Sequence, residues 1–273
     1  MPELPEVETV KRTLKPKLIG KTIKKVDVLY SNIIAYPKIE EFTKQIEKQS
    51  IIDIKRRGKW LIFELDNYYL LSHLRMEGKY HFKKLDDKIE KHEHVNFILN
   101  DDICLRYNDT RKFGKMYLYT KEEAFNNKPL NELGLEPWDD NLTTDYLKEK
   151  YNNKTIQIKT VFLDQCIITG IGNIYADEIL FLSNINPLKK AKDLNKKELN
   201  NIINNTKLIL EKAIDDGGTT IRSYESSEGV HGRFQQNLHV HNQLGKKCNV
   251  CGNEIIKIQV NGRGTYYCPK CQK

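Results

Sequence analysis

The chain has 273 residues, of which 39% are hydrophobic and 30% are charged, so it contains enough apolar material for a globular core. Its length favours two domains but permits one large domain. A formal net charge of +8 indicates a polyanionic partner. We expect nucleic acid rather than a membrane, because no basic amphipathic helix with a Trp or Phe face is visible. A charge that only aids solubility is the alternative.

No apolar run approaches the roughly 20 residues that a membrane-spanning helix needs. The N-terminus also lacks the basic segment and apolar stretch of a signal peptide. We therefore expect a cytoplasmic protein with no membrane association. In that compartment we expect the six cysteines to be thiols or metal ligands rather than disulfides.

The first expected element is a helix from Pro5 to about Leu18. Pro5 suits the first helical position, Glu6 and Glu8 suit the positive end of the helix, and a glycine follows its end. The apolar residues on one face are Val7, Val10, Leu14 and Leu18.

Strands are expected from Lys21 to about Tyr119. The segments are short, rich in β-branched and aromatic residues, and separated by Asn, Asp and Gly. They are KTIKKVDVLY, SIIDIKRR, KWLIFELD, YYLLSHL, HVNFILN, ICLRYND and KMYLY. This density predicts an antiparallel β-sandwich or barrel of roughly 100 residues. The polar segment 121–139 is interpreted as a linker.

Helices are expected after the linker. Thr144 is expected to cap a helix that runs through Tyr151, and a second helix is expected over Ile156–Asp164. Asn195 and Glu198 form a capping box that opens a third helix, which a pair of glycines ends. The apolar side of this third helix carries Leu199, Ile202, Ile203, Leu210 and Ala213.

Four cysteines near the end of the chain have the spacing C-x2-C-x16-C-x2-C. They are Cys248, Cys251, Cys268 and Cys271. Two residues between thiolates let both reach one ion, and four sulfurs complete a tetrahedral shell, so we predict one structural Zn²⁺. The spacer fits a hairpin with GRG as its turn. Cys104 and Cys166 are interpreted as core residues.

Two features in the second half of the chain suit phosphate. Gly170 and Gly172 precede an amphipathic helix that Asn173 is expected to cap, and the N–H groups at a helix start bind anions. Arg263 lies at the expected hairpin tip, where a guanidinium can contact phosphate. Tight packing for the glycines and a solvated side chain for Arg263 are the alternatives.

Two segments that join strands, HLRMEGKY and YNDTRKFG, carry large side chains. The first contains Met76 and the second contains Arg111 and Phe113. Met and Phe on exposed turns can act as wedges between stacked bases, and a nearby arginine can pair with the base left behind by an extruded nucleotide. The equal alternative is that Met76 and Phe113 fold inward.

In chain order these motifs resemble the bacterial formamidopyrimidine-DNA glycosylase family. The resemblance covers nearly the whole chain and rests on MPELPEVET, RRGKW, HLRMEG, KHEHV, YNDTRKFG, LGLEP, ITGIGNIYADE, GGTTIRSY, GRFQQ and the four-cysteine module. It implies an enzyme that binds damaged double-stranded DNA and excises oxidised purines, chiefly 8-oxoguanine and formamidopyrimidines. It also implies β,δ-elimination that nicks the strand, and we expect a monomer.

The implied fold is α+β, with an N-terminal antiparallel β-sandwich flanked by an N-terminal helix. A helix–two-turns–helix domain and a C-terminal zinc-finger hairpin follow. We assign residues 1–120 to the catalytic sandwich domain and 121–139 to the linker. The helical domain covers 140–236, with a lesion-recognition loop at 217–236, and the zinc finger covers 237–273.

The resemblance also implies catalytic roles. Pro2, whose amine is freed when Met1 is removed, is the expected nucleophile that forms a Schiff base, since a terminal amine titrates near about 8. Glu3 is the expected acid, although an acid at a helix terminus more commonly interacts with the dipole. Lys59 is the expected second proton donor, and Arg263 is expected to assist the second elimination.

The remaining implied residues contact DNA. The expected backbone contacts and inserted side chains are His73, Met76, His92, Arg111, Phe113, Lys154 and Asn173. The residues expected to recognise the flipped base are Glu77, Thr219, Thr220 and Tyr224. The last three belong to a segment that resembles a lid over the base.

Two alternatives remain. A sister branch with the same fold removes oxidised pyrimidines, but its chains tend to begin MPEGPE and lack the RRGKW form. A zinc-containing DNA-binding protein without catalysis would explain the charge, the cysteines and the phosphate turn. It would not explain the Pro–Glu pair at positions 2 and 3.

Overall fold

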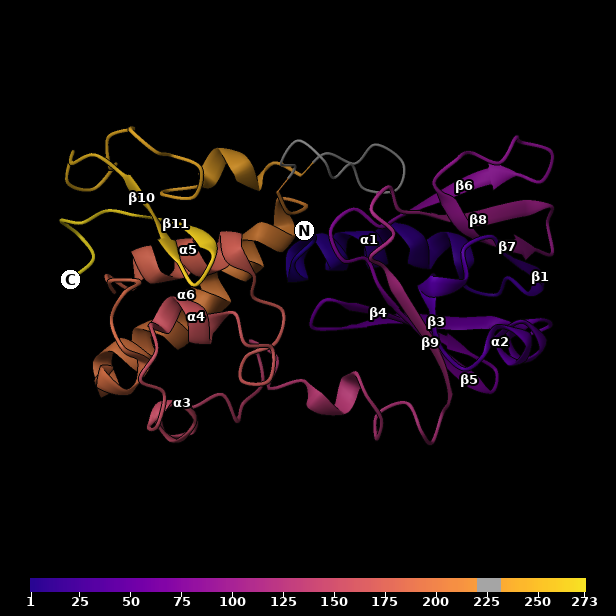
Figure 1. Cartoon of the computed structure of the whole chain (residues 1–273), viewed down its shortest axis with the longest axis horizontal. Coiled ribbons are helices and arrows are strands. Elements are labelled where there is room, and N and C mark those ends of the chain that lie inside the picture. Colours follow the sequence, from indigo (N-terminus) through magenta and orange to yellow (C-terminus); the bar gives the residue numbers. More distant parts are fainter. Residues whose placement is uncertain (220–231) are drawn as a thin grey trace. The chain divides into compact units, whose positions relative to one another are not determined.

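The computed structural model describes residues 1–219 and 232–273, and the chain divides into two compact units (Figure 1). Of the described residues, the first contains Met1–Asn131, Thr219 and Gly232, and the second contains Glu132–Gly218 and Arg233–Lys273. The boundary between residues 131 and 132 falls inside the segment interpreted as a linker. No helix in the described part of the chain is long and apolar enough to cross a membrane.

Two β-sheets build the first unit. One sheet has the strand order β1–β7–β8–β6, and the other has the order β2–β9–β5–β4–β3. The strands are β1 (Ile23–Val28), β2 (Ile34–Tyr36), β3 (Ile51–Arg57), β4 (Trp60–Leu65), β5 (Tyr68–His73), β6 (Lys79–Lys84), β7 (Glu93–Leu99), β8 (Ile103–Asn108) and β9 (Lys115–Thr120). Paired strands are antiparallel, except that β2 and β9 are parallel.

Every strand segment expected from the sequence forms a strand, whereas β2 and β6 were not anticipated. β2 is only three residues long. β6 has the sequence KYHFKK, in which lysines obscure the alternation of Tyr80 and Phe82. Tyr80 nevertheless crosses between the sheets, because its hydroxyl donates to Ser72 Oγ of β5 at 2.7 Å. The expected β-sandwich is therefore confirmed, with one parallel pair added.

Helix α1 (Leu4–Leu18) closes one side of the core that the two sheets share (Figure 1). Its apolar face is fully buried there, as the periodicity predicted, through Val7, Val10, Leu14 and Leu18. A second helix, α2 (Ile39–Ile46), was not anticipated and buries Phe42 and Ile46. The N-terminal helix is thus part of the hydrophobic core and not an appended arm.

The second unit is helical. Its helices are α3 (Thr144–Tyr151), α4 (Ile158–Phe162), α5 (Asn173–Leu182) and α6 (Lys196–Asp215). Short 3₁₀ turns in the chain are η1 (Ser31–Ile33), η2 (Leu130–Glu132), η3 (Ala191–Asp193) and η4 (Phe234–Asn237). The cap of α3 is Thr143 and not Thr144, because the Thr143 hydroxyl accepts a hydrogen bond from the Tyr146 N–H at 3.1 Å. α4 is shorter than the expected helix.

Helix α6 follows the sequence prediction closely. Asn195 and Glu198 exchange side-chain and backbone hydrogen bonds of 3.0 and 2.9 Å, which completes the capping box. All five apolar residues expected on its inner side are buried. Gly217 and Gly218 end the helix with φ angles of 74° and 80°, a conformation that glycine adopts without strain.

The hairpin near the C-terminus consists of β10 (Ile256–Val260) and β11 (Arg263–Tyr267). Its turn is Asn261–Gly262, with φ angles of 45° and 73°, as in the two-residue turns that Asn-Gly favours. Arg263 therefore begins β11 opposite Val260 and does not form the tip, which corrects the expected GRG turn. Its side chain remains exposed beside the turn.

The two cysteines outside the zinc pattern differ from each other. Cys104 is buried in β8, as expected. Cys166 is exposed in the turns between α4 and α5, so its interpretation as a core residue was wrong. An apolar pair follows Cys166 in the sequence, but a turn places the thiol on the outside.

Candidate functional site

The first residues of the chain are held at the start of α1. Pro2 is buried and Glu3 is only 2% exposed, while Met1 is 45% exposed. Glu3 and Glu6 form a capping box in which Glu6 Oε2 accepts the Glu3 N–H at 2.8 Å. Chain termini usually fray, so this order at residue 2 requires specific contacts, and the capping box supplies one.

The same Glu6 carboxylate binds Thr219, the first of the residues expected in the lid. Glu6 Oε1 accepts the Thr219 N–H at 2.7 Å and the Thr219 hydroxyl at 3.1 Å. Thr219 is 5% exposed. Thr220 and Tyr224, the other residues expected in the lid, lie outside the described residues. The sequence placed Glu6 at the helix start but did not reveal this contact, because its partner lies 213 residues away.

Lys59 lies in the tight turn between β3 and β4. Arg57 pairs with Trp60, so Gly58 and Lys59 form a two-residue turn, and Gly58 has a φ of 55°. The lysine is 6% exposed and therefore is not one more solvated surface residue. Burial of a lysine at a hairpin turn is costly unless neighbouring groups hold its ammonium.

His73 ends β5 and packs against Trp60, with ring centroids 4.7 Å apart. Burial, with smaller contributions from Arg75 and Lys59, lowers the pKa of His73 to about 3. The ring is therefore neutral at physiological pH. Its Nδ1 accepts the Arg75 N–H at 2.9 Å, so the ring hydrogen resides on Nε2. The Nε2–H group of His73 is thus the one hydrogen-bond donor that the ring can offer to an anion.

A buried carboxylate shapes the segment that carries Arg111 and Phe113. Asp109 is fully buried, and its two oxygens accept the N–H groups of Arg111 at 3.0 Å and Gly114 at 2.8 Å. The Arg111 guanidinium lies 4.9 Å from the centre of the Phe113 ring. Phe113 is 51% exposed, so it points outward and does not fold into the core.

The two segments proposed as wedges lie side by side. Thr110 Oγ1 donates to Glu77 Oε2, which joins them directly. Gly78 and Gly114 both pack against the Tyr107 hydroxyl. A Cβ added to Gly78 would lie 2.3 Å from this oxygen, and one added to Gly114 would lie 1.7 Å from it. Met76, between these contacts, is half-buried. The structure therefore brings Met76, Arg111 and Phe113 into one region and engages Glu77 in holding it.

In the second unit, a glutamine organises the turns before α5. The Gln165 amide donates to the carbonyls of Leu163 at 3.0 Å and Ile171 at 2.9 Å, and its oxygen accepts the Gly170 N–H at 2.9 Å. Gly170 has a φ of 94°, which explains its glycine. The role of Gln165 depends on contacts that local patterns do not reveal.

Two expectations about α5 need correction. Gly172 is the cap, and Asn173 is the first helical residue, so Asn173 does not cap the helix. Gly172 has an ordinary extended conformation, with a φ of −126°. The helix is almost completely buried and is not amphipathic. Asn173 instead uses its side-chain amide to donate to the Gly264 carbonyl at 2.9 Å, next to Arg263.

Two buried acids join α5 to the C-terminal module. Glu178 accepts the backbone N–H groups of residues 239, 240 and 241 at 2.8 to 2.9 Å. Asp177 accepts Lys159 Nζ at 2.5 Å and His241 Nδ1 at 2.7 Å. Both acids are at most 1% exposed. These contacts hold Asn173 and Arg263 within one rigid part of the second unit.

The other expected DNA contacts lie near the surface. His92 is half-buried, and among the described residues its Nδ1 has no hydrogen-bond partner. Lys154 is partly exposed, with its Nζ 4.0 Å from Asp164 Oδ2. Arg263 is exposed. His73 and His92 belong to the first unit, whereas Lys154, Asn173 and Arg263 belong to the second.

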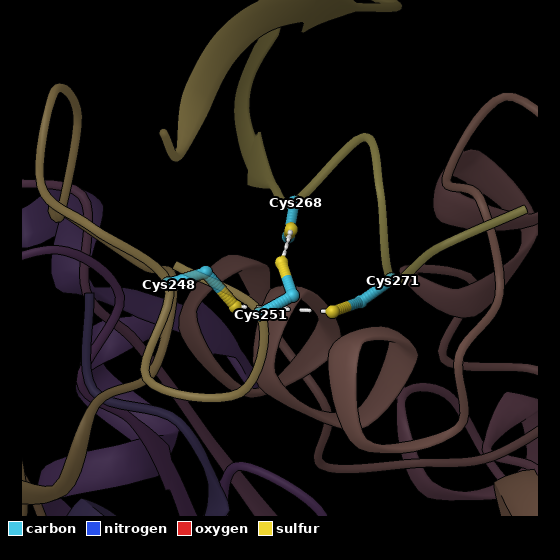
Figure 2. Close-up of side chains that lie close together, drawn as sticks. All are labelled: Cys248, Cys251, Cys268 and Cys271. Atoms are coloured by element: carbon cyan, nitrogen blue, oxygen red, sulfur yellow. Dashed lines mark hydrogen bonds between the residues drawn. The ribbon is translucent and has the colours of Figure 1, made fainter. Parts of the chain in front are cut away.

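The four cysteines of the expected zinc site converge (Figure 2). Their sulfurs all lie within 4.8 Å of one another, with 3.4 Å between Cys251 and Cys268 and 3.9 Å between Cys248 and Cys271. Zinc–thiolate bonds of about 2.3 Å in a tetrahedron place sulfurs about 3.8 Å apart. The residues therefore fit one Zn²⁺. The small core around them contains Phe181 of α5.

The site yields a prediction for Asp109. Asp109→Asn keeps one oxygen acceptor but replaces the other with an NH₂ group, which would face a backbone N–H donor and leave it without an acceptor. We therefore expect the free energy of unfolding to fall by about 1–3 kcal/mol. Urea denaturation measures this change. The control is Asp102→Asn, because the Asp102 side chain is 76% exposed and should lower stability far less. Equal effects of the two substitutions would contradict the role assigned to Asp109.

A second prediction concerns the metal. Purified protein should contain one zinc ion per chain, and chelation should unfold the hairpin because the bound ion stabilises its small core. Metal analysis and amide hydrogen exchange over residues 245–273 measure both effects. Cys251→Ser should lose the metal, whereas Cys166→Ser should retain it, since Cys166 lies outside the cluster. Retention of zinc by the Cys251 variant would contradict the four-ligand site.

Family models match three successive parts of the chain. Residues 1–116 match the formamidopyrimidine-DNA glycosylase N-terminal domain, 133–225 match the H2TH domain of the same family, and 245–273 match a zinc finger found in FPG and IleRS. A formamidopyrimidine-DNA glycosylase of Oceanobacillus iheyensis is 50% identical over 273 residues, which cover 100% of this chain and 98% of the relative.

Solved structures agree with this match. A variant of Lactococcus lactis FPG in complex with a Fapy-dG containing DNA has a TM-score of 0.94 and 39% identity, with 100% of both chains covered. The same bacterium's Fpg with an abasic site containing DNA has a TM-score of 0.93 and 40% identity, with 99% of both covered. Its wild-type FPG with an oxidized pyrimidine containing DNA has a TM-score of 0.92 and 38% identity, with 100% of both covered.

The sandwich with its N-terminal helix, the helical unit and the zinc hairpin thus occur together and in the same order as in these relatives. The chain belongs to the formamidopyrimidine-DNA glycosylase family and is a DNA glycosylase of base-excision repair.

Proposed function

We propose that this enzyme excises oxidised purines from double-stranded DNA by covalent attack of the Pro2 amine and then nicks the strand. The observation that carries this proposal is the burial and hydrogen bonding of the chain's first residues. Pro2 is buried at the start of α1, and the adjacent Glu3 N–H is fixed by Glu6. A purely structural helix start does not require a buried residue 2.

The chemistry follows from a secondary amine at the chain end. Once Met1 is removed, the Pro2 nitrogen attacks the sugar C1′, the bond from C1′ to the base breaks, and the base leaves with a proton. Opening of the sugar ring gives an iminium ion. The iminium acidifies the C2′ hydrogen, so its removal expels the 3′ phosphate, and a second elimination expels the 5′ phosphate. The positive end of α1 favours the neutral amine that this attack needs.

Glu3 and Lys59 supply the protons in this proposal. Glu3 lies next to the nucleophile and is 2% exposed, so it can protonate the sugar oxygen as the ring opens. Lys59 is the second donor, toward the departing base. Its burial at the β3–β4 turn supports this assignment, since an ordinary surface lysine would be solvated. Arg263 assists the second elimination.

The DNA contacts follow from the donors that the structure leaves available. His73 Nε2 carries a hydrogen, the His92 side chain is half-buried, and Arg263 is exposed. We assign these groups, with Lys154 and Asn173, to phosphates of the damaged strand. A further set, Met76, Arg111 and Phe113, fills the space of the extruded nucleotide.

Base recognition is assigned to Glu77 and to the segment that starts at Thr219. The described part of this segment supports the assignment, because Thr219 is bonded to Glu6 and therefore lies beside the N-terminal site. Through this hydrogen bond, Thr219 couples the base-recognition segment to α1, the helix that follows Pro2. Thr220 and Tyr224 complete the proposed set.

Trapping tests the nucleophile. Borohydride reduces an iminium, so the Met-processed chain should form a covalent complex with an 8-oxoguanine duplex. Pro2→Gly should trap at least about tenfold more slowly, because it removes the secondary amine, and a chain that retains Met1 should not trap. Gel electrophoresis measures the complex.

The matched control for trapping is Pro16→Ala, which changes a proline in the same helix but near its other end. This variant should trap like the unmodified chain. Preserved DNA binding without any trapped complex from the Met-processed chain would refute the covalent mechanism.

Oxidised pyrimidines are the second candidate substrate, because the wild-type Lactococcus lactis relative was solved with such a lesion in its DNA. We expect this chain to excise 8-oxoguanine at least about tenfold faster than an oxidised pyrimidine in the same sequence context. Single-turnover rates on the two duplexes measure this preference. A higher rate on the pyrimidine lesion would reverse the assignment.

A further inference from the structure

Arg56 joins the two parts of the first unit that carry the proposed catalytic groups. Its Nε donates to Glu8 Oε2 at 3.1 Å, and its Nη1 donates to the Gly58 carbonyl at 3.0 Å. Glu8 belongs to α1, and Gly58 immediately precedes Lys59 in the turn. One planar guanidinium therefore connects the helix that begins at the nucleophile with the backbone that carries the second proton donor.

The surroundings of this connection favour a fixed geometry. The side chains of Arg56 and Glu8 are each only 10% exposed. Burial opposes the charge on Glu8, but Lys11 and Arg56 hold its pKa below the usual range, so it stays ionised. Lys11 and Arg12 bind Glu8 Oε1 at 2.7 and 3.1 Å. These contacts involve Oε1 only, whereas Oε2 accepts the Arg56 Nε–H from β3.

The hydrogen bond from Arg56 to the Gly58 carbonyl ties the backbone of this turn to the residue that also binds α1. Gly58 adopts a φ of 55° and has no side chain that could anchor the turn. The Gly58 carbonyl belongs to the peptide bond that joins Gly58 to Lys59, so a hydrogen bond to this carbonyl holds the backbone at Lys59. A displacement of about 1 Å between reacting groups can cost about 100-fold in rate, so such an anchor matters to a proton donor.

We propose that Arg56 is a positioning residue: through Glu8 and the Gly58 carbonyl it sets the Lys59 turn relative to Pro2 and Glu3. The inference rests on the proposed function, in which Lys59 protonates the departing base. Arg56 itself transfers no proton. Its effect should therefore be confined to the step that uses Lys59.

The test separates positioning from general stabilisation. Excision of 8-oxoguanine requires protonation of a leaving base, whereas a preformed abasic site has no base to lose. Arg56→Lys keeps the positive charge but removes the planar fork that reaches two acceptors. We expect it to slow single-turnover excision about tenfold, and to leave borohydride trapping on a preformed abasic duplex within about twofold of the unmodified enzyme.

Two further variants sharpen this test. Arg12→Lys makes the same exchange on the same carboxylate, but Arg12 is 58% exposed and is bonded to the other oxygen of Glu8, so both rates should stay unchanged. Glu8→Gln removes the charged acceptor at nearly constant shape and should reproduce the selective loss seen with Arg56→Lys. It provides a second route should Arg56→Lys not fold.

The outcomes are distinguishable with Lys59→Ala as the reference. If Lys59→Ala excises normally, the proton-donor role in the proposed function fails and the inference fails with it. If Lys59→Ala is impaired but Arg56→Lys and Glu8→Gln excise normally, the inference alone fails. Equal losses on both duplexes, with a lower urea midpoint, would show a structural ion pair and would also overturn the positioning role.

Discussion

The buried carboxylate of Glu6 is the interaction on which the N-terminal site depends. One of its oxygens fixes the backbone N–H of Glu3, and the other binds both donor groups of Thr219. A terminal amine is a useful nucleophile at neutral pH, but a chain end is normally its most mobile part. Glu6 and the buried face of α1 together remove that mobility. The N-terminal site is therefore ordered because the first turn of α1 is buried in the core of the first unit.

The same principle recurs elsewhere in the chain, where buried acids hold flexible segments in place. Asp109 organises the segment of Arg111 and Phe113, and Glu178 holds the backbone ahead of the zinc module. In each case a carboxylate accepts several backbone N–H groups, which is how a loop without regular structure satisfies its polar atoms. Both acids lie within quoted motifs, Asp109 in YNDTRKFG and Glu178 in ITGIGNIYADE, but the motifs did not reveal which backbone groups these carboxylates hold.

Local patterns predicted the elements whose stability is local. The buried face of α1, the capping box of α6 and the four zinc ligands were all readable, because each is written within a few residues or a fixed spacing. Two of the errors were local misreadings of strand and turn signals, and the third came from tertiary burial. Lysines hid β6, an Asn-Gly turn shifted Arg263, and complete burial replaced the expected amphipathic α5. The Glu8–Arg56 contact spans 48 positions, so no local pattern could reveal it.

The central claim is that the nitrogen of residue 2 makes the covalent bond to DNA. Mass spectrometry of the borohydride-reduced complex, after nuclease and protease digestion, locates that bond directly. The account predicts that the sugar remnant is attached to the Pro2 nitrogen of a peptide that has lost Met1. A remnant attached to a lysine, such as Lys59, with the Pro2 peptide unmodified, would contradict it.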